Sequence, residues 1–434
     1  MNPKLEIKAD WEKLDSGSAE ERATFAAIGI RYNHIWLTEA EDAFVKRIRQ
    51  QVHLSGYRLA EWLAWNWWRL RWEPRRTTTE WAMAHKLSTI GGGYVWPNIT
   101  IVSDGERVIF DAQATEPRPD EPLHYIARVA AIVTAEEFES AVDRFVEQVR
   151  GQLREERVTN SNLESIWSHV LKERAIPDMT RRRKLEALLG SDPDEINEAV
   201  VNGLVEDSKN LGDLAVEELA ADRNNEGKPL TADDVKGLVR SAGFDSDPGD
   251  AVRLNDKAFS ALPQCDAAWK RGVAAASALR AQEQLDTSLI SNDRLCRLAG
   301  VPKNIVQPGE KTAALSFAFD ETPGRGSIVL RSNFEVGRRF NLARLIGDRV
   351  AVAAGGRLRP ATRTSTYRQK LQRAFAGEFL CPFEKLVDFL KGDFSAEMIE
   401  DAAAHFNVSD RTVRTHLANH RLIGDEDLIS DFAE

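Results

Sequence analysis

The chain has 434 residues, a formal net charge of −10, 29% charged residues and 42% hydrophobic residues. This length predicts about two or three domains, and the acidic balance argues against binding nucleic acid over the whole surface, although it leaves room for a local basic patch. No run of about 18 apolar residues occurs, and the first residues form no apolar signal segment, so we expect no membrane partner and a cytoplasmic protein.

The N-terminal region is rich in tryptophan, since nine of the eleven Trp residues lie between Trp11 and Trp96. The densest run spans residues 57–72. The spacing there predicts one helix with an aromatic face formed by Trp62, Trp65, Trp68 or Arg69, and Trp72.

Two interpretations of this helix stay open. The arginines that interleave with its aromatic face could hold phosphates while the rings stack bases, which would make a nucleic-acid platform of Arg58, Arg69, Arg71 and Trp72. Alternatively, the tryptophans fill a core and the arginine stems cover its edge. The clean helical period favours the second, structural interpretation.

A β-hairpin follows this helix. Residues 98–102 and 107–110 read as strands, and Asp104-Gly105 between them is a strong turn signal. The glycine triplet at 91–93 lacks the Gly-Lys-Ser/Thr ending of a phosphate-binding loop, so we expect a turn there. With a further strand at 130–133 and a helix over 135–154, residues 1–155 form a small α+β domain.

The middle of the chain predicts several helices over residues 156–220, punctuated by Pro177 and by Asp192-Pro193-Asp194. Residues 221–260 are more polar and contain Asn224-Asn225-Glu226-Gly227, so we expect a linker with one short helix at 232–241.

The C-terminal domain, residues 261–434, begins with an alanine-rich helix at 268–279. Apolar runs at 313–319 and 327–330, split by Pro323-Gly324, predict a strand pair. Two motifs follow. The first reads Arg-Arg-Phe-Asn-Leu-Ala-Arg-Leu-Ile-Gly-Asp from Arg338 to Asp348, and the second ends in Phe-Ala-Gly-Glu-Phe-Leu-Cys-Pro at Pro382.

Together these motifs resemble those of the ImmA/IrrE family of metallopeptidase-like proteins. In that family an Arg-Arg-Phe-x-x-Ala lead-in runs into a helical His-Glu-x-x-His, and the first Glu of a later helix is the third zinc ligand. The resemblance covers roughly 170 residues from about Pro263 and implies a zincin-like α+β fold. It also points to bacterial or phage regulation, including toxin–antitoxin and phage-defence systems.

The catalytic residues of that family are replaced in this chain. Arg344 and Asp348 stand at the two His positions, Leu345 at the Glu position, and Gln369 at the third ligand position. A guanidinium cannot bind a metal ion, and Leu cannot take a proton from metal-bound water. We therefore expect no metal, no cofactor and no peptidase activity. The three cysteines include no Cys-x-x-Cys pair that could supply another zinc site.

Residues 396–423 read as a helix-turn-helix whose second helix is capped by Ser409. Its outward side chains suit phosphates and base edges, so the candidate DNA contacts are Arg411, Arg414, Thr415 and Asn419. The same segment could instead be an internal packing element. His416 and His420 have zinc-ligand spacing, but no third ligand is apparent.

The sequence thus predicts a multi-domain, mainly helical α+β protein with a small N-terminal domain and a degenerate zincin-like C-terminal domain. The expected function is a non-catalytic regulatory or interaction protein with another protein as its partner. The alternative is a sequence-specific DNA-binding regulator. In place of the metal, we expect a polar cluster of Arg344, Asp348 and Gln369 between the two motif helices, because Arg344 and Asp348 are spaced i and i+4.

Overall fold

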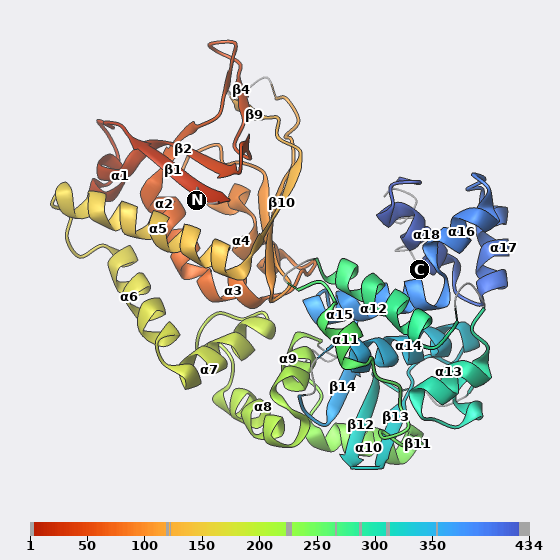
Figure 1. Cartoon of the computed structure of the whole chain (residues 1–434). Coiled ribbons are helices and arrows are strands. Elements are labelled where there is room, and N and C mark those ends of the chain that lie inside the picture. Colours follow the sequence, from red (N-terminus) through yellow and green to blue (C-terminus); the bar gives the residue numbers. More distant parts are fainter. Residues whose placement is uncertain are drawn as a thin grey trace. The chain divides into compact units, whose positions relative to one another are not determined.

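The computed structural model describes residues 4–118, 121, 123–222, 228–264, 267–285, 289–309, 313–352 and 355–424. The chain divides into two units, which we call unit 1 (residues 1–202) and unit 2 (residues 203–434). Each has its own hydrophobic core, and both mix helices with small antiparallel sheets (Figure 1). The mixed α+β class is therefore confirmed.

Three antiparallel sheets lie in unit 1. Their strand orders are β1-β2-β3 with β6 also on β2, then β10-β8-β7, and β5-β4-β9. The strands are β1 (Leu5–Trp11), β2 (Phe25–Tyr32), β3 (Ile35–Trp36), β4 (Ala40–Asp42), β5 (Arg47–Arg49), β6 (Val52–Ser55), β7 (Ile99–Ser103), β8 (Arg107–Ala112), β9 (Leu123–Tyr125) and β10 (Val129–Thr134). The predicted hairpin is β7–β8, with Gly105 in the turn at φ +97°. The strands before residue 98 were not predicted.

The helices of unit 1 cover these sheets, and the long amphipathic α5 packs on β1, β8 and β10. They are α1 (Ala19–Thr24), α2 (Gly56–Trp65), α3 (Trp67–Trp72), α4 (Thr79–His85), α5 (Ala135–Glu155), α6 (Asn162–Arg174) and α7 (Pro177–Leu188), with a 3₁₀ turn at Leu87–Thr89. Because α6 and α7 pack on α2 and α3, the predicted boundary at residue 155 does not separate them from the first domain.

The helix predicted over residues 57–72 is two helices, because the backbone changes direction at Asn66 between α2 and α3. Because of this break, the tryptophans of α3 do not continue the face of α2 on which Trp62 and Trp65 lie. As a result Trp67 and Trp68 are buried, whereas Trp65 is 55% exposed and does not belong to a buried stripe. The prediction that Trp65 fills the core is therefore wrong.

Unit 2 is built around one four-stranded antiparallel sheet of order β11-β13-β12-β14. Its strands are β11 (Phe244–Ser246), β12 (Ser316–Thr322), β13 (Arg325–Val329) and β14 (Leu358–Ala361). The predicted strand pair is β12–β13. The predicted linker at 221–260 is wrong in its second half, because residues 244–246 form the edge strand β11 on β13. Residues 223–227 of that segment lie outside the described residues.

Helix α14 packs on β12 and β14, and α15 and α12 pack against α14 and each other (Figure 1). The division between the units falls inside α8 (Glu198–Leu211). The other helices of unit 2 are α9 (Asp213–Ala221), α10 (Ala232–Ala242), α11 (Asp256–Ser260), α12 (Ala268–Gln282), α13 (Asn292–Ala299), α14 (Glu335–Ala351), α15 (Tyr367–Leu380), α16 (Phe383–Leu390), α17 (Ala396–Phe406) and α18 (Asp410–Asn419), with a 3₁₀ turn at Lys303–Val306.

The two helices of the predicted helix-turn-helix are α17 and α18. The Ser409 hydroxyl accepts a hydrogen bond from the Thr412 N–H and caps α18, as expected. Within the described part of the chain, no helix combines the length and the apolar character that crossing a bilayer demands.

Candidate functional site

The two motif segments form α14 and α15, which pack closely. The Thr366 hydroxyl caps α15 by accepting from the Gln369 N–H. Gly347 on α14 faces Phe375 on α15 so closely that an added Cβ would lie 2.6 Å from the ring. Only a glycine allows this approach, and it brings the side chains at the former ligand positions within reach of one another.

Arg344 and Gln369 form the hydrogen bond expected between the two helices. One guanidinium nitrogen of Arg344, Nη2, donates to Gln369 Oε1 at 2.6 Å and to the main-chain oxygen of Thr362 at 2.6 Å. Gln369 Oε1 also accepts from the Thr362 N–H at 2.9 Å, and its Nε2 donates to the Pro360 oxygen at 3.1 Å. Gln369 therefore ties α15 to α14 and to the end of β14.

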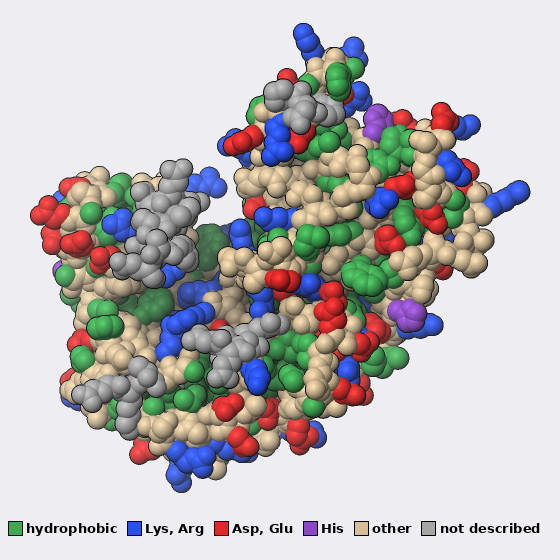
Figure 2. Space-filling view, turned by 180° about the vertical axis from the view of Figure 1, so that it is seen from behind, with side chains coloured by type: hydrophobic (Ala, Val, Ile, Leu, Met, Phe, Trp, Pro, Cys, Tyr) green, Lys and Arg blue, Asp and Glu red, His purple; other side chains and the backbone are tan. Residues whose placement is uncertain are grey.

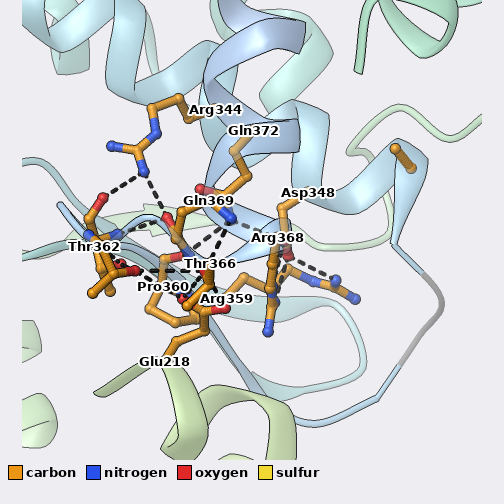
Figure 3. Close-up of polar contacts among 12 residues, drawn as sticks. Glu218, Arg344, Asp348, Arg359, Pro360, Thr362, Thr366, Arg368, Gln369 and Gln372 are labelled. Atoms are coloured by element: carbon orange, nitrogen blue, oxygen red, sulfur yellow. Dashed lines mark hydrogen bonds and ion pairs between the residues drawn. The ribbon is translucent and has the colours of Figure 1, made fainter. Parts of the chain in front are cut away.

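The expected pairing of Arg344 with Asp348 is wrong. Asp348 is fully buried and accepts two hydrogen bonds from Arg368, at 2.6 and 2.7 Å. Arg359 donates to it at 3.3 Å, and Gln372 Nε2 at 2.9 Å. Arg368 donates through two nitrogens to the two oxygens of Asp348, and this paired geometry is favoured over a single contact from Arg344 one turn away on the same helix. Figure 3 shows the Arg344 guanidinium on the opposite side of Gln369 from Asp348.

We call this set the α14–α15 network: Arg344, Asp348, Arg359, Arg368, Gln369 and Gln372. Its two halves meet at the Pro360 oxygen, which accepts from both Gln369 and Gln372. Burial alone would raise the pKa of Asp348, but Arg368, Arg359 and Gln372 outweigh burial, so the pKa is lowered and the carboxylate stays ionised. Arg368 is also linked electrostatically to Glu218 on α9.

The chemistry of the network does not suit a catalytic metal. Arg344 and Gln369 are hydrogen-bonded to each other, Asp348 is enclosed by two guanidinium groups, and Leu345 is a buried apolar side chain. Throughout the described ranges, no group of three or more His, Cys, Asp or Glu side chains is placed to hold a metal ion. His416, one of the two histidines at zinc-ligand spacing, is buried, and burial together with His420 lowers its pKa to about 4.

The arginines of the proposed nucleic-acid platform in unit 1 have carboxylate partners. Arg58 Nε lies 2.5 Å from Glu21, Arg69 Nε 2.8 Å from Glu73, and Arg71 Nε 2.6 Å from Glu139. Arg69 and Arg71 are also buried, and the Arg71 guanidinium covers the Trp72 ring at 3.7 Å from its centroid. These contacts favour the structural interpretation of Arg58, Arg69, Arg71 and Trp72.

The candidate DNA-contacting residues lie on α18, and none of the four is buried. Arg411 and Asn419 are exposed, while Arg414 and Thr415 are partly exposed. The opposite face of α18 packs into unit 2 through Val413, His416 and Leu417. Figure 2 shows Lys and Arg side chains interspersed with Asp and Glu over much of the face that it presents.

Several polar residues in the interior could not be found from the sequence. In unit 1, buried Glu73 pairs with Arg69 and His85. In unit 2, Arg331 and Arg373 lie near Arg344, the exposed Arg363 lies near Arg331, and Glu218 accepts from Thr366 at 2.9 Å. Only the placement of Arg331 just after a predicted strand had a sequence signal, because β14, which precedes Arg363, was not predicted.

Comparisons of the chain with models of protein families, with curated protein sequences and with solved structures gave no match. The likeness to the ImmA/IrrE family therefore stays a prediction from the two motifs.

Proposed function

We propose that the chain is a non-catalytic regulatory or interaction protein whose C-terminal unit uses a peptidase-like helix pair as a scaffold. The observation that carries this proposal is the Arg344–Gln369 hydrogen bond, which joins two of the three positions that supply metal ligands in the family that the motifs resemble. The resemblance of the motifs adds the context of bacterial or phage regulation, such as a toxin–antitoxin or phage-defence system.

The metal part of the proposal is tested on the full chain. Elemental analysis after dialysis, together with incubation with a repressor-type protein substrate and added zinc, should show no stoichiometric metal and no cleavage. About one zinc per chain, or specific cleavage that chelators abolish, would overturn the proposal.

A docking surface for a protein partner is the turn between β4 and β5. Phe44 is 83% exposed and Ile48 64% exposed, yet the turn is well formed, because Asp42 accepts from the Phe44 and Val45 N–H groups and pairs with Arg49. An ordered turn that holds large apolar side chains in water suits a partner with an apolar patch. The neighbouring Lys46 and Arg47 favour an acidic rim on that partner.

Co-purification from the native host tests this surface. A specific protein should be retained by the wild-type chain and lost with the Phe44→Ser/Ile48→Ser double variant. Met83→Ser is the matched control, because Met83 is another exposed apolar residue of unit 1, at 55%. Equal retention by all three chains, or no retained protein, would contradict an interaction through this turn.

DNA binding remains the second candidate, favoured by the capped helix pair α17–α18 and by the four unburied polar side chains of α18. Arg414→Ala should then weaken binding to a specific duplex by about 1–3 kcal/mol in a fluorescence anisotropy titration. Binding that is equally weak for every sequence and vanishes at physiological salt would exclude this function.

A further inference from the structure

The arginines of unit 2 include two groups that differ in how fully their guanidinium groups are hydrogen-bonded. In the first group, Arg271 and Arg339 each donate through three nitrogens to main-chain or amide oxygens. In the second group the bonding is incomplete. Arg344 is 6% exposed and donates only through Nη2, while its buried Nε has no partner.

Three further arginines nearby make one hydrogen bond or none through their guanidinium groups. Arg331 and Arg373 are partly buried, whereas Arg363 is exposed. Arg373 donates through one nitrogen to the Thr364 oxygen at 2.8 Å, and the Arg331 and Arg363 guanidinium groups make no hydrogen bond to a described residue. Across the described ranges, none of the four lies within ion-pair distance of a carboxylate. We call Arg331, Arg344, Arg363 and Arg373 the arginine cluster.

The fold brings these four side chains to one place. β13 and β14 both pair antiparallel with β12, so they run in the same direction and end at the same edge of the sheet. Arg331 lies two residues after the end of β13, and Arg363 two residues after the end of β14. Arg344 from α14 bonds the main chain just before Arg363, and Arg373 from α15 bonds it just after, at Thr362 and Thr364.

The cluster carries more positive charge than its surroundings balance. The positive charges of Arg373 and Arg331 both help to lower the pKa of Arg344, and the charge of Arg363 helps to lower the pKa of Arg331. The nearest acids are Glu218 and Asp222, both at α9, and burial raises the pKa of each and so disfavours its charged form. Burial lowers the pKa of Arg344 to about 9, so this guanidinium is still charged at neutral pH.

We propose that the arginine cluster is a binding site for the phosphate group of a small ligand, either inorganic phosphate or a phosphomonoester such as a nucleotide. Four guanidinium groups facing two carboxylates leave an excess of about two positive charges, which matches the charge of about −1.5 to −2 on a phosphate near pH 7. Guanidinium groups also suit phosphate oxygens through paired N–H donors. The hydroxyls of Thr362 and Thr364, which hydrogen-bond each other, and the start of α15 lie beside the cluster.

This site goes beyond the proposed function, since it requires neither a protein partner nor the loss of a metal. The two proposals also fail separately. Zinc content and co-purification test the first, and phosphate affinity tests the second.

The experiment is a titration calorimetry series on the full chain with inorganic phosphate and with adenosine monophosphate, at constant ionic strength against a chloride control. The variants are Arg331→Gln and Arg363→Gln, because these side chains are less buried than Arg344 and the variants should fold. Arg325→Gln is the matched control: it begins β13 at the end opposite Arg331, and its side chain is 78% exposed. Melting temperatures measured without ligand establish that each variant is folded.

We expect the wild type and Arg325→Gln to bind the ligand alike, and each cluster variant to bind about ten- to a hundredfold more weakly. Tighter binding of adenosine monophosphate than of phosphate identifies a phosphomonoester as the ligand, and the reverse order identifies free phosphate. No heat at about 10 mM of either ligand would overturn the proposal. So would equal weakening by Arg325→Gln, or binding of a DNA duplex without binding of either small ligand.

Discussion

The buried arginines of the two units differ in what their charges face. In unit 1, Arg69 lies beside Glu73 and Arg71 beside Glu139, so each cation is balanced within the protein. In unit 2, Arg344 and Arg373 face main-chain oxygens and other arginines. A balanced pair is sufficient for a structural role. An unbalanced cluster keeps the cost of burying charge without the compensating attraction, which is more typical of a site that awaits a ligand.

The network around Asp348 is the exception inside unit 2, and it should show the largest effect. Asp348→Asn removes the negative charge that Arg368 and Arg359 share. Among the described residues, it leaves Arg368 without its paired carboxylate, and Arg359 with only the longer contact to Asp320 at 3.8 Å. We expect a loss of about 3–5 kcal/mol in the free energy of unfolding, measured by urea denaturation.

Asp388→Asn is the matched control, because the exposed Asp388–Lys385 pair should contribute less than about 0.5 kcal/mol. The pKa of Asp348 is lowered, so its contribution should be present above the pKa of an unfolded Asp and fall away as the pH drops through the folded value. A loss for Asp348→Asn as small as the control's would show that the buried pair is not what holds α14 to α15.

Replacing one arginine from each unit by methionine compares the stability contribution of a carboxylate-paired arginine with that of an arginine that has no ion pair. Arg69→Met leaves Glu73 buried with His85 and Arg76 as its remaining partners, and should cost about 3 kcal/mol. Arg344→Met removes a charge that has no carboxylate within ion-pair distance among the described residues, while Gln369 keeps its bond from the Thr362 N–H. This change should alter stability by less than about 1.5 kcal/mol. Equal losses in urea denaturation would remove the distinction drawn between the two units.

A smaller effect separates the tryptophans on the two sides of Asn66. Trp68→Phe removes a hydrogen bond to Glu173 from a ring that is 2% exposed, and should cost about 1–3 kcal/mol. Trp65→Phe changes a side chain that is 55% exposed and should stay within about 0.5 kcal/mol. Thermal unfolding of the two variants in parallel measures the difference, and a larger loss for Trp65→Phe would contradict the difference in burial between the two rings.

The smallest effect concerns Glu218. Its raised pKa means that the folded chain holds a proton that the unfolded chain releases, so ionising Glu218 lowers stability as the pH rises above the unfolded value. Glu218→Gln should therefore stabilise the chain at pH 7–8, on the order of 1 kcal/mol, and have no effect below about pH 4. It should also tighten phosphate binding at the arginine cluster. Stabilisation that does not change with pH would mean that Glu218 is neutral throughout.

Elements with local signals could be predicted from the sequence, and those defined by distant contacts could not. Asp104-Gly105 indicated the β7–β8 hairpin, and Ser409 indicated the start of α18. β14 is only four residues long and contains Pro360, which is tolerated there because β14 is an edge strand. Local reading of the sequence therefore gave no sign of it.

The site was predicted in part for the same reason. Arg344 and Gln369 are hydrogen-bonded between the two motif helices, as their positions in the motifs predicted. The partner of Asp348 depends instead on the rotation of α15 about its axis, which places Arg368, the residue next to Gln369, against the carboxylate. Helical spacing within α14 contains no information about that rotation.

The short strand β11 has a practical consequence for work on unit 2 alone. A fragment that starts at residue 261, as the motifs alone would suggest, lacks Phe244–Ser246 and leaves the β13 edge open. Open edges pair with other chains, so such a fragment should aggregate. A fragment that starts ahead of α8, near Asn197, keeps the edge covered and also retains Glu218 and Asp222, so the charge around the arginines stays as it is in the whole protein.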